Sequence, residues 1–123
     1  MNLRESLERG AALFNEGLFW EAHEAWEEAW LELEDQPKLF LQGLIQIAAG
    51  YYKATVQDQP SGCVKLLRSG LEKVSACPPD FLCVQTAALL PAVRASLAEA
   101  ELWLAGGPGI SRPGIPRLHL LPA

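Results

Sequence analysis

The amino-acid sequence predicts an all-α protein: an antiparallel bundle of four to five helices followed by a C-terminal tail rich in proline and glycine. Two observations carry this prediction. Apolar residues recur at helical spacing through most of the chain, and no segment alternates apolar and polar residues between turn signals as a half-buried strand does. With 123 residues, half of them hydrophobic, the chain is expected to form one bundle domain over residues 1–105 and a non-helical tail over residues 106–123.

The first three expected helices follow one another closely. The first spans about residues 3–16 and ends at Gly17, because glycine readily adopts the left-handed conformation that terminates helices. The second spans about residues 19–34. The third spans about residues 38–56, behind Pro37, and it is apolar nearly all round, which predicts burial on most of its sides.

Two further helices are expected, over about residues 61–74 and 86–104, each with apolar residues at helical spacing. Pro91 lies inside the last of these helices and removes one backbone hydrogen bond. The cysteines are odd in number and lack Cys-x-x-Cys spacing, so we expect reduced, inert thiols rather than a disulfide framework or a zinc knuckle. They are Cys63, Cys77 and Cys83.

The formal net charge is -5, and the charges are unevenly distributed. Between Arg9 and Lys38 the chain has eight acidic residues and no lysine or arginine, whereas basic residues outnumber acidic ones from Lys38 onward. No basic stripe stands out, so a nucleic-acid partner is not expected; the acidic helix instead suits a cation or a basic surface on another helix. The chain lacks both an 18-residue apolar run and the apolar segment of a signal peptide, which favours a cytoplasmic protein that does not span a membrane.

The most informative motif lies in the second helix. There, His23-Glu24-x-x-Glu27 is similar to the His-Glu-x-x-His motif of zinc proteases, with a carboxylate in place of the second histidine. His23 and Glu27 are four residues apart and share one helix face. One interpretation is a site for a divalent metal such as zinc: His23 and Glu27 are ligands, and Glu24 is a third ligand or the base that deprotonates a bound water. The distant His119 is the other candidate for a third ligand.

The second interpretation is a structural polar network buried in the bundle. His23 and Glu27 fall on a helix face that is otherwise aromatic and apolar, and buried polar groups need hydrogen-bond partners. Gln42 and Gln46, four residues apart, are the only amides on the third helix. We therefore expect a polar cluster between the two helices, with Glu24 and Lys53 near its rim. Its members are His23, Glu27, Gln42 and Gln46. The tryptophans of the second helix are expected in the core or at an interface: Trp20, Trp26 and Trp30.

Two segments of the sequence resemble a known bacterial and archaeal family, the domain of unknown function 309. They are Phe14-Asn15-x-Gly17-x-x-Trp20-Glu21-x-His23-Glu24-x-x-Glu27-x-x-Trp30 and Leu41-Gln42-Gly43-Leu44-Ile45-Gln46-x-Ala48-Ala49. The resemblance covers roughly residues 7–74 and implies a small cytosolic helical bundle, labelled in that family as a predicted metal-dependent hydrolase. Family members often carry a histidine near the end of the third helix, where this chain has Tyr52-Lys53. The motif positions are Glu21, His23, Glu24, Glu27, Gln42 and Gln46.

Two functions stay open on the sequence alone. The favoured one is a non-enzymatic interaction or oligomerisation module, because neither a third metal ligand nor a nucleophile with its base is evident. The alternative is a metal-dependent hydrolase in which His23 and Glu27 hold the ion, Glu24 activates water, and Gln42 and Gln46 orient the substrate. We also expect a homodimer. The leucines of the tail are expected to bury against the same chain or a second copy: Leu118, Leu120 and Leu121.

Overall fold

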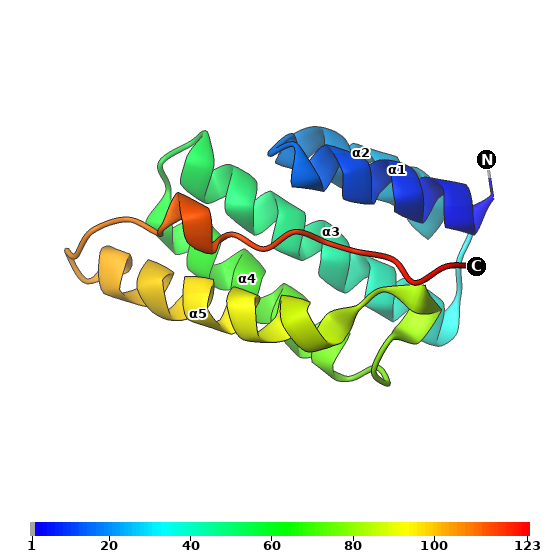
Figure 1. The fold of residues 1–123 in the computed structure, drawn as a ribbon. Helices are drawn as coiled ribbons and strands as arrows, with labels where there is room; N and C mark the ends of the chain where they lie inside the picture. The colour runs from blue at the N-terminus through cyan, green and yellow to red at the C-terminus, as the bar shows by residue number, and fades with distance from the viewer. Residues whose placement is uncertain (1) are drawn as a thin grey trace.

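The longest helix, α3 (Asp35–Thr55), runs through the middle of the molecule, with helices packed on both sides of it (Figure 1). Helices α1 (Leu3–Asn15) and α2 (Phe19–Trp30) lie on one side, and α4 (Pro60–Ser75) and α5 (Thr86–Leu104) lie on the other. The computed structural model describes residues 2–123, and in this range the remaining elements are two short 3-10 turns and an isolated β-bridge. The predicted all-α bundle is confirmed.

Helix boundaries follow the predicted breaks with two differences. As predicted, Gly17 terminates α1: its φ is 80°, and the Leu18 N–H donates to the Leu13 carbonyl at 2.9 Å. Helix α2 ends at Trp30, earlier than predicted, and α3 begins at Asp35, earlier than predicted. The reason is that Pro37 lacks only an N–H that the first turn of a helix leaves unpaired, so α3 extends in front of it.

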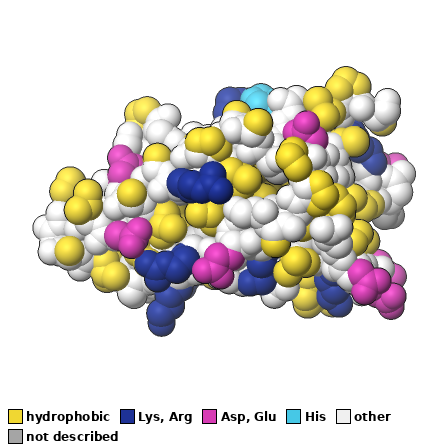
Figure 2. Space-filling model, turned by 90° about the horizontal axis from the view of Figure 1, so that it is seen from below, with side chains coloured by type: hydrophobic (Ala, Val, Ile, Leu, Met, Phe, Trp, Pro, Cys, Tyr) yellow, Lys and Arg dark blue, Asp and Glu magenta, His cyan; other side chains and the backbone are white. Residues whose placement is uncertain are grey.

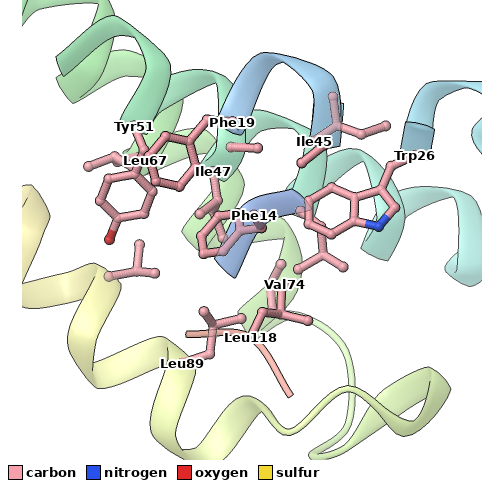
Figure 3. Close-up of a cluster of buried hydrophobic side chains, with 14 of the residues drawn as sticks. Phe14, Phe19, Trp26, Ile45, Ile47, Tyr51, Leu67, Val74, Leu89 and Leu118 are labelled. Atoms are coloured by element: carbon pink, nitrogen blue, oxygen red, sulfur yellow. The ribbon is translucent and has the colours of Figure 1, made fainter. Parts of the chain in front are cut away.

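An aromatic cluster joins the helices at the centre of the core (Figure 3). Phe14 of α1 meets Phe19 of α2 edge to face, with ring centroids 5.0 Å apart, and meets Tyr51 of α3 at 5.9 Å. The buried Tyr51 hydroxyl is 2.9 Å from Ser96 Oγ and so ties α3 to α5. Burial raises the pKa of Tyr51 above its usual value, so the phenol stays neutral.

Glycines bring α3 and α4 into backbone contact. A Cβ placed on Gly70 would lie 2.7 Å from the carbonyl oxygen of Gly43, and a Cβ on Gly43 would lie 2.9 Å from the Gly70 carbonyl oxygen. On the other side of the core, a Cβ on Gly10 of α1 would overlap the indole of Trp26. These positions need glycine because the neighbouring backbone or ring fills the space of a side chain.

The C-terminal tail packs against its own chain beside α1 and α3 (Figure 1). The Asn15 side chain holds the tail by two hydrogen bonds, donating to the Leu118 carbonyl at 2.9 Å and accepting from the Leu118 N–H at 2.7 Å. Val84 and Leu120 form an antiparallel bridge, and the Arg4 guanidinium donates to the Leu121 carbonyl at 2.7 Å. Leu118 is fully buried and the next leucines are partly buried, so the expectation that they pack is confirmed, on the same chain.

None of the helices in residues 2–123 combines the length and the apolar character that crossing a bilayer requires.

Substituting Gly70 by alanine tests the contact between α3 and α4. Because the new methyl group meets the Gly43 backbone, Gly70→Ala should lower the free energy of unfolding by about 1–3 kcal/mol. Gly62→Ala is the matched control in the same helix, because a Cβ there meets only the flexible Lys53 side chain. It should be neutral or stabilise by up to ~1 kcal/mol. Urea denaturation of both variants measures this difference, and equal losses would contradict it.

Substituting Asn15 tests how the tail is held. Asn15→Ala should cost about 1–3 kcal/mol, because the buried Leu118 N–H and carbonyl lose their partners. In a chain truncated after Ala105, which should itself melt at a lower temperature, the same substitution should cost much less. The double-mutant cycle compares four proteins by thermal denaturation: the full chain and the truncated chain, each with and without Asn15→Ala. A cost that persists undiminished in the truncated chain would show that Asn15 acts independently of the tail.

Candidate functional site

The residues predicted to carry function lie where α2 runs antiparallel to α3. Two contacts set the register of this pair: Trp20 meets Tyr52 with ring centroids 5.1 Å apart, and Lys38 Nζ lies 4.3 Å from the centre of the Trp30 ring. His23, between the two tryptophans, is stacked on Trp20 with centroids 4.5 Å apart. The helices thus form a ladder of aromatic and cationic contacts along one side of the bundle.

His23 and Glu27 do share a face, as their spacing predicts. His23 Nε2 lies 3.6 Å from Glu27 Oε2, which is longer than a good hydrogen bond. The two side chains differ in environment: His23 is 15% exposed, whereas Glu27 is 52% exposed. An ion pair this exposed contributes little to stability.

The expected buried network does not form. Glu27 is exposed, and neither Gln42 nor Gln46 makes a side-chain hydrogen bond within the described residues. Both His23 Nδ1 and Gln46 Oε1 are buried and lack a hydrogen-bond partner in residues 2–123. The prediction of a hydrogen-bonded His/Glu/Gln cluster is therefore wrong.

The error came from the choice of buried helix face. Helix α2 buries Phe19, Ala22, Ala25 and Trp26. A helical wheel on which the large side chains are grouped predicts a neighbouring arc of the helix as the buried face. As a result Trp26 alone among the three tryptophans is fully buried, and Trp20 is 42% exposed.

The side chains do not fit a metal ion. No group of three or more histidine, cysteine, aspartate or glutamate side chains within residues 2–123 gathers closely enough to hold one. Glu24 is exposed on the outside of α2, and His119 is exposed on the tail. A zinc site normally needs at least three protein ligands, so His23 and Glu27 alone do not make one.

The outer surface of α2 is instead strongly acidic. All eight acidic residues between Arg9 and Lys38 are exposed. Of the three ion pairs within residues 2–123, the only one on α2 is the long His23–Glu27 contact. Lys38, the nearest lysine in sequence, lies over the Trp30 ring. This surface therefore carries negative charge that the chain itself leaves largely unpaired.

Apolar side chains accompany these acids. A shallow hollow of about 400 Å³ is lined by Glu24, Glu27, Glu28, Trp30 and Leu31. Leu31 is 70% exposed. The sequence analysis expected Trp20 in the core or at an interface and did not identify Leu31 as a surface group, although both lie close to Glu27 around the helix. We call Trp20, Glu24, Glu27, Glu28 and Leu31 the α2 outer face.

The cysteine thiols show no sign of activation. Burial raises the pKa of the Cys63 thiol to about 11 and raises the pKa of Cys77 as well. Both thiols are free and buried, and Cys83 is free and partly buried. No disulfide links these cysteines within residues 2–123. A thiol with a raised pKa is a poor nucleophile.

A metal titration tests the absence of a histidine-centred metal site. Because His23 and Glu27 lack a third ligand, zinc or manganese should shift the melting temperature of the unmodified protein and of His23→Ala equally. A shift of the melting temperature that is equal in the two proteins would report weak metal binding at exposed carboxylates. A stabilisation by several degrees that disappears in His23→Ala would show that the ion recruits a further ligand to this histidine.

One comparison with known proteins gives a match. A family model, described as domain of unknown function (DUF309), matches residues 7–66, which run from α1 into α4 and include the whole of α2 and α3. All six motif residues of the sequence analysis fall inside this range. No curated protein matches the chain. Residues 7–66 of this protein are thus similar to the DUF309 family.

Proposed function

We propose that this protein is a non-enzymatic interaction module that docks a basic amphipathic segment of a partner protein on the α2 outer face. The observation that carries the proposal is the combination of unpaired carboxylates with exposed Trp20 and Leu31 on the same helix. Charge alone is common on protein surfaces, but large apolar side chains among like charges are typical of binding surfaces.

The chemistry of the α2 outer face selects the partner. Lysine or arginine side chains would pair with Glu24, Glu27 and Glu28 around the apolar hollow. Arginine can also stack on the exposed indole of Trp20. A partner helix with basic and apolar residues at helical spacing would place its leucines beside Leu31 and its cations over the acids. Helix α2 has 12 residues and is therefore ~18 Å long, which suits about three turns of such a partner.

The same features disfavour an enzyme. Hydrolysis by a cysteine nucleophile needs a reactive thiolate with a base in reach, and burial raises the pKa of the Cys63 and Cys77 thiols. His23 is packed between Trp20 and Glu27, which suits a residue that shapes a surface. The proposal also accounts for the exposure of Trp20, which a core role leaves unexplained.

A synthetic peptide pair tests the proposal. A helical peptide of leucine and lysine should bind and change the Trp20 fluorescence, with an affinity that falls as salt is added, whereas the same peptide with glutamate for lysine should not bind. Glu24→Gln with Glu28→Gln should weaken binding of the basic peptide at least about tenfold.

The matched control removes the same charge elsewhere. Asp58→Asn with Glu72→Gln alters two exposed acids on the loop before α4 and on α4, and it should leave the affinity nearly unchanged. An equal loss in both double variants would show that net charge, and not the α2 outer face, governs binding. Equal binding of the acidic peptide would likewise overturn the proposal.

A further inference from the structure

Helix α5 is apolar on both sides, although only one side faces the core. Its buried face consists of Leu89, Val93, Ser96 and Ala100. The opposite side shows hydrophobic side chains among scattered charges on the surface formed by α4 and α5 (Figure 2). We call its exposed apolar residues the α5 outer face: Ala87, Ala88, Pro91, Ala95, Ala98, Leu102 and Ala105.

One basic and one acidic residue border the α5 outer face on the same edge. Arg94 and Glu101 are seven residues apart, which is two helical turns, so their side chains lie about 20° apart around the helix. Glu101 is half exposed and pairs with Arg68 of α4 at 3.2 Å. Arg94 is exposed and makes neither an ion pair nor a side-chain hydrogen bond with any residue from 2 to 123.

We propose that a second copy of this chain packs antiparallel on the α5 outer face, around a two-fold axis next to Ala98. In a two-fold dimer each residue faces a partner position reflected through the axis. With the axis between positions 97 and 98, Arg94 of one protomer lies level with Glu101 of the partner subunit, on the same edge of the interface. Symmetry creates this contact twice.

The sizes of the side chains fit such a contact. Alanines along the α5 outer face let two helices approach to about 8 Å, the short end of helix packing distances. Leu102 is 66% exposed, and in this register it inserts between positions 91 and 95 of the opposing helix, which are small or flat. The contact thus hides the largest exposed apolar side chain of the α5 outer face.

Self-complementarity favours a second copy over an unrelated partner. The α5 outer face supplies both members of each ion pair, and its apolar stripe matches itself under the same rotation. The α2 outer face is excluded from a two-fold contact with itself because its carboxylates would repel one another. The tail is excluded as a cover, because it packs beside Asn15.

The dimer does not depend on the proposed function, because α5 and α2 lie on opposite sides of α3 (Figure 1). If both hold, the dimer presents two α2 outer faces to one partner, and the second binding event becomes intramolecular.

Mass measurement of the full chain tests the dimer. Sedimentation equilibrium at ~100 µM protein should give about twice the 13.4 kDa of one chain. Ala98→Glu places two like charges beside the axis and should give the mass of one chain. The matched control Ala12→Glu changes an exposed alanine of α1 and should stay dimeric. A single-chain mass for the unmodified protein, or a dimer that survives Ala98→Glu, would overturn the proposal.

A charge exchange between protomers tests the register and avoids reliance on one variant. Arg94→Glu alone and Glu101→Arg alone should each give single-chain mass, because each brings like charges together at both symmetry-related contacts. Mixed in equal amounts, the two variants should restore the dimer, because each contact then joins opposite charges. Circular dichroism checks that each variant is folded. Failure of the folded mixture to associate would overturn the proposed register, since loss of the Arg68 pair alone cannot be repaired by mixing.

Discussion

Backbone contact between α3 and α4 is the constraint from which the rest of the bundle follows. Gly43 and Gly70 place the two helices so close that neither position has room for a methyl group. Helix α3 is thereby covered along that side and must be covered on the others by α1, α2 and the tail. Helix α2 approaches the bundle through a face that buries the small Ala22 together with Phe19 and Trp26. That approach turns His23 to the rim of the interface and Trp20 into solvent.

The fold was predictable because its signals are local. Helix boundaries are marked in the sequence by Gly17, Pro37 and the proline-rich tail. The apolar character of α3 indicates the centre of the bundle before any contact is known. The site was less predictable because it depends on which arc of α2 faces inward. A wheel ranks side chains by size and polarity, whereas packing ranks them by how closely two backbones can approach. Ala22 and Ala25 carry little weight on a wheel but lie on the buried face of α2, so Glu27 was assigned to the interior and lies outside.

Asn15 shows a second limit of local patterns. Nothing in its sequence neighbourhood, where Gly17 marks the end of the first helix, indicates a distant partner. In the fold its amide pairs with both backbone groups of Leu118, more than one hundred residues away. Hydrogen bonds of this kind let an extended segment pack on helices without leaving its backbone unpaired. The tail therefore completes the core with Leu118 rather than adding a helix, as the prolines beside it require.

The two proposed surfaces differ in how they relate to the family. Helix α2 lies wholly within the part of the chain that matches the family model, whereas α5 and the tail lie beyond it. The acidic docking face is thus a hypothesis about the shared framework, and the α5 dimer is a hypothesis about this chain.

The physical requirements of the two proposed contacts also differ. Docking on α2 rests on unlike charge and weakens as salt screens it, while the α5 contact rests on close packing of small residues, with Arg94 and Glu101 setting the register. Salt should therefore separate the two interactions in one preparation: added salt releases a basic ligand from α2 long before it dissociates protomers joined through α5.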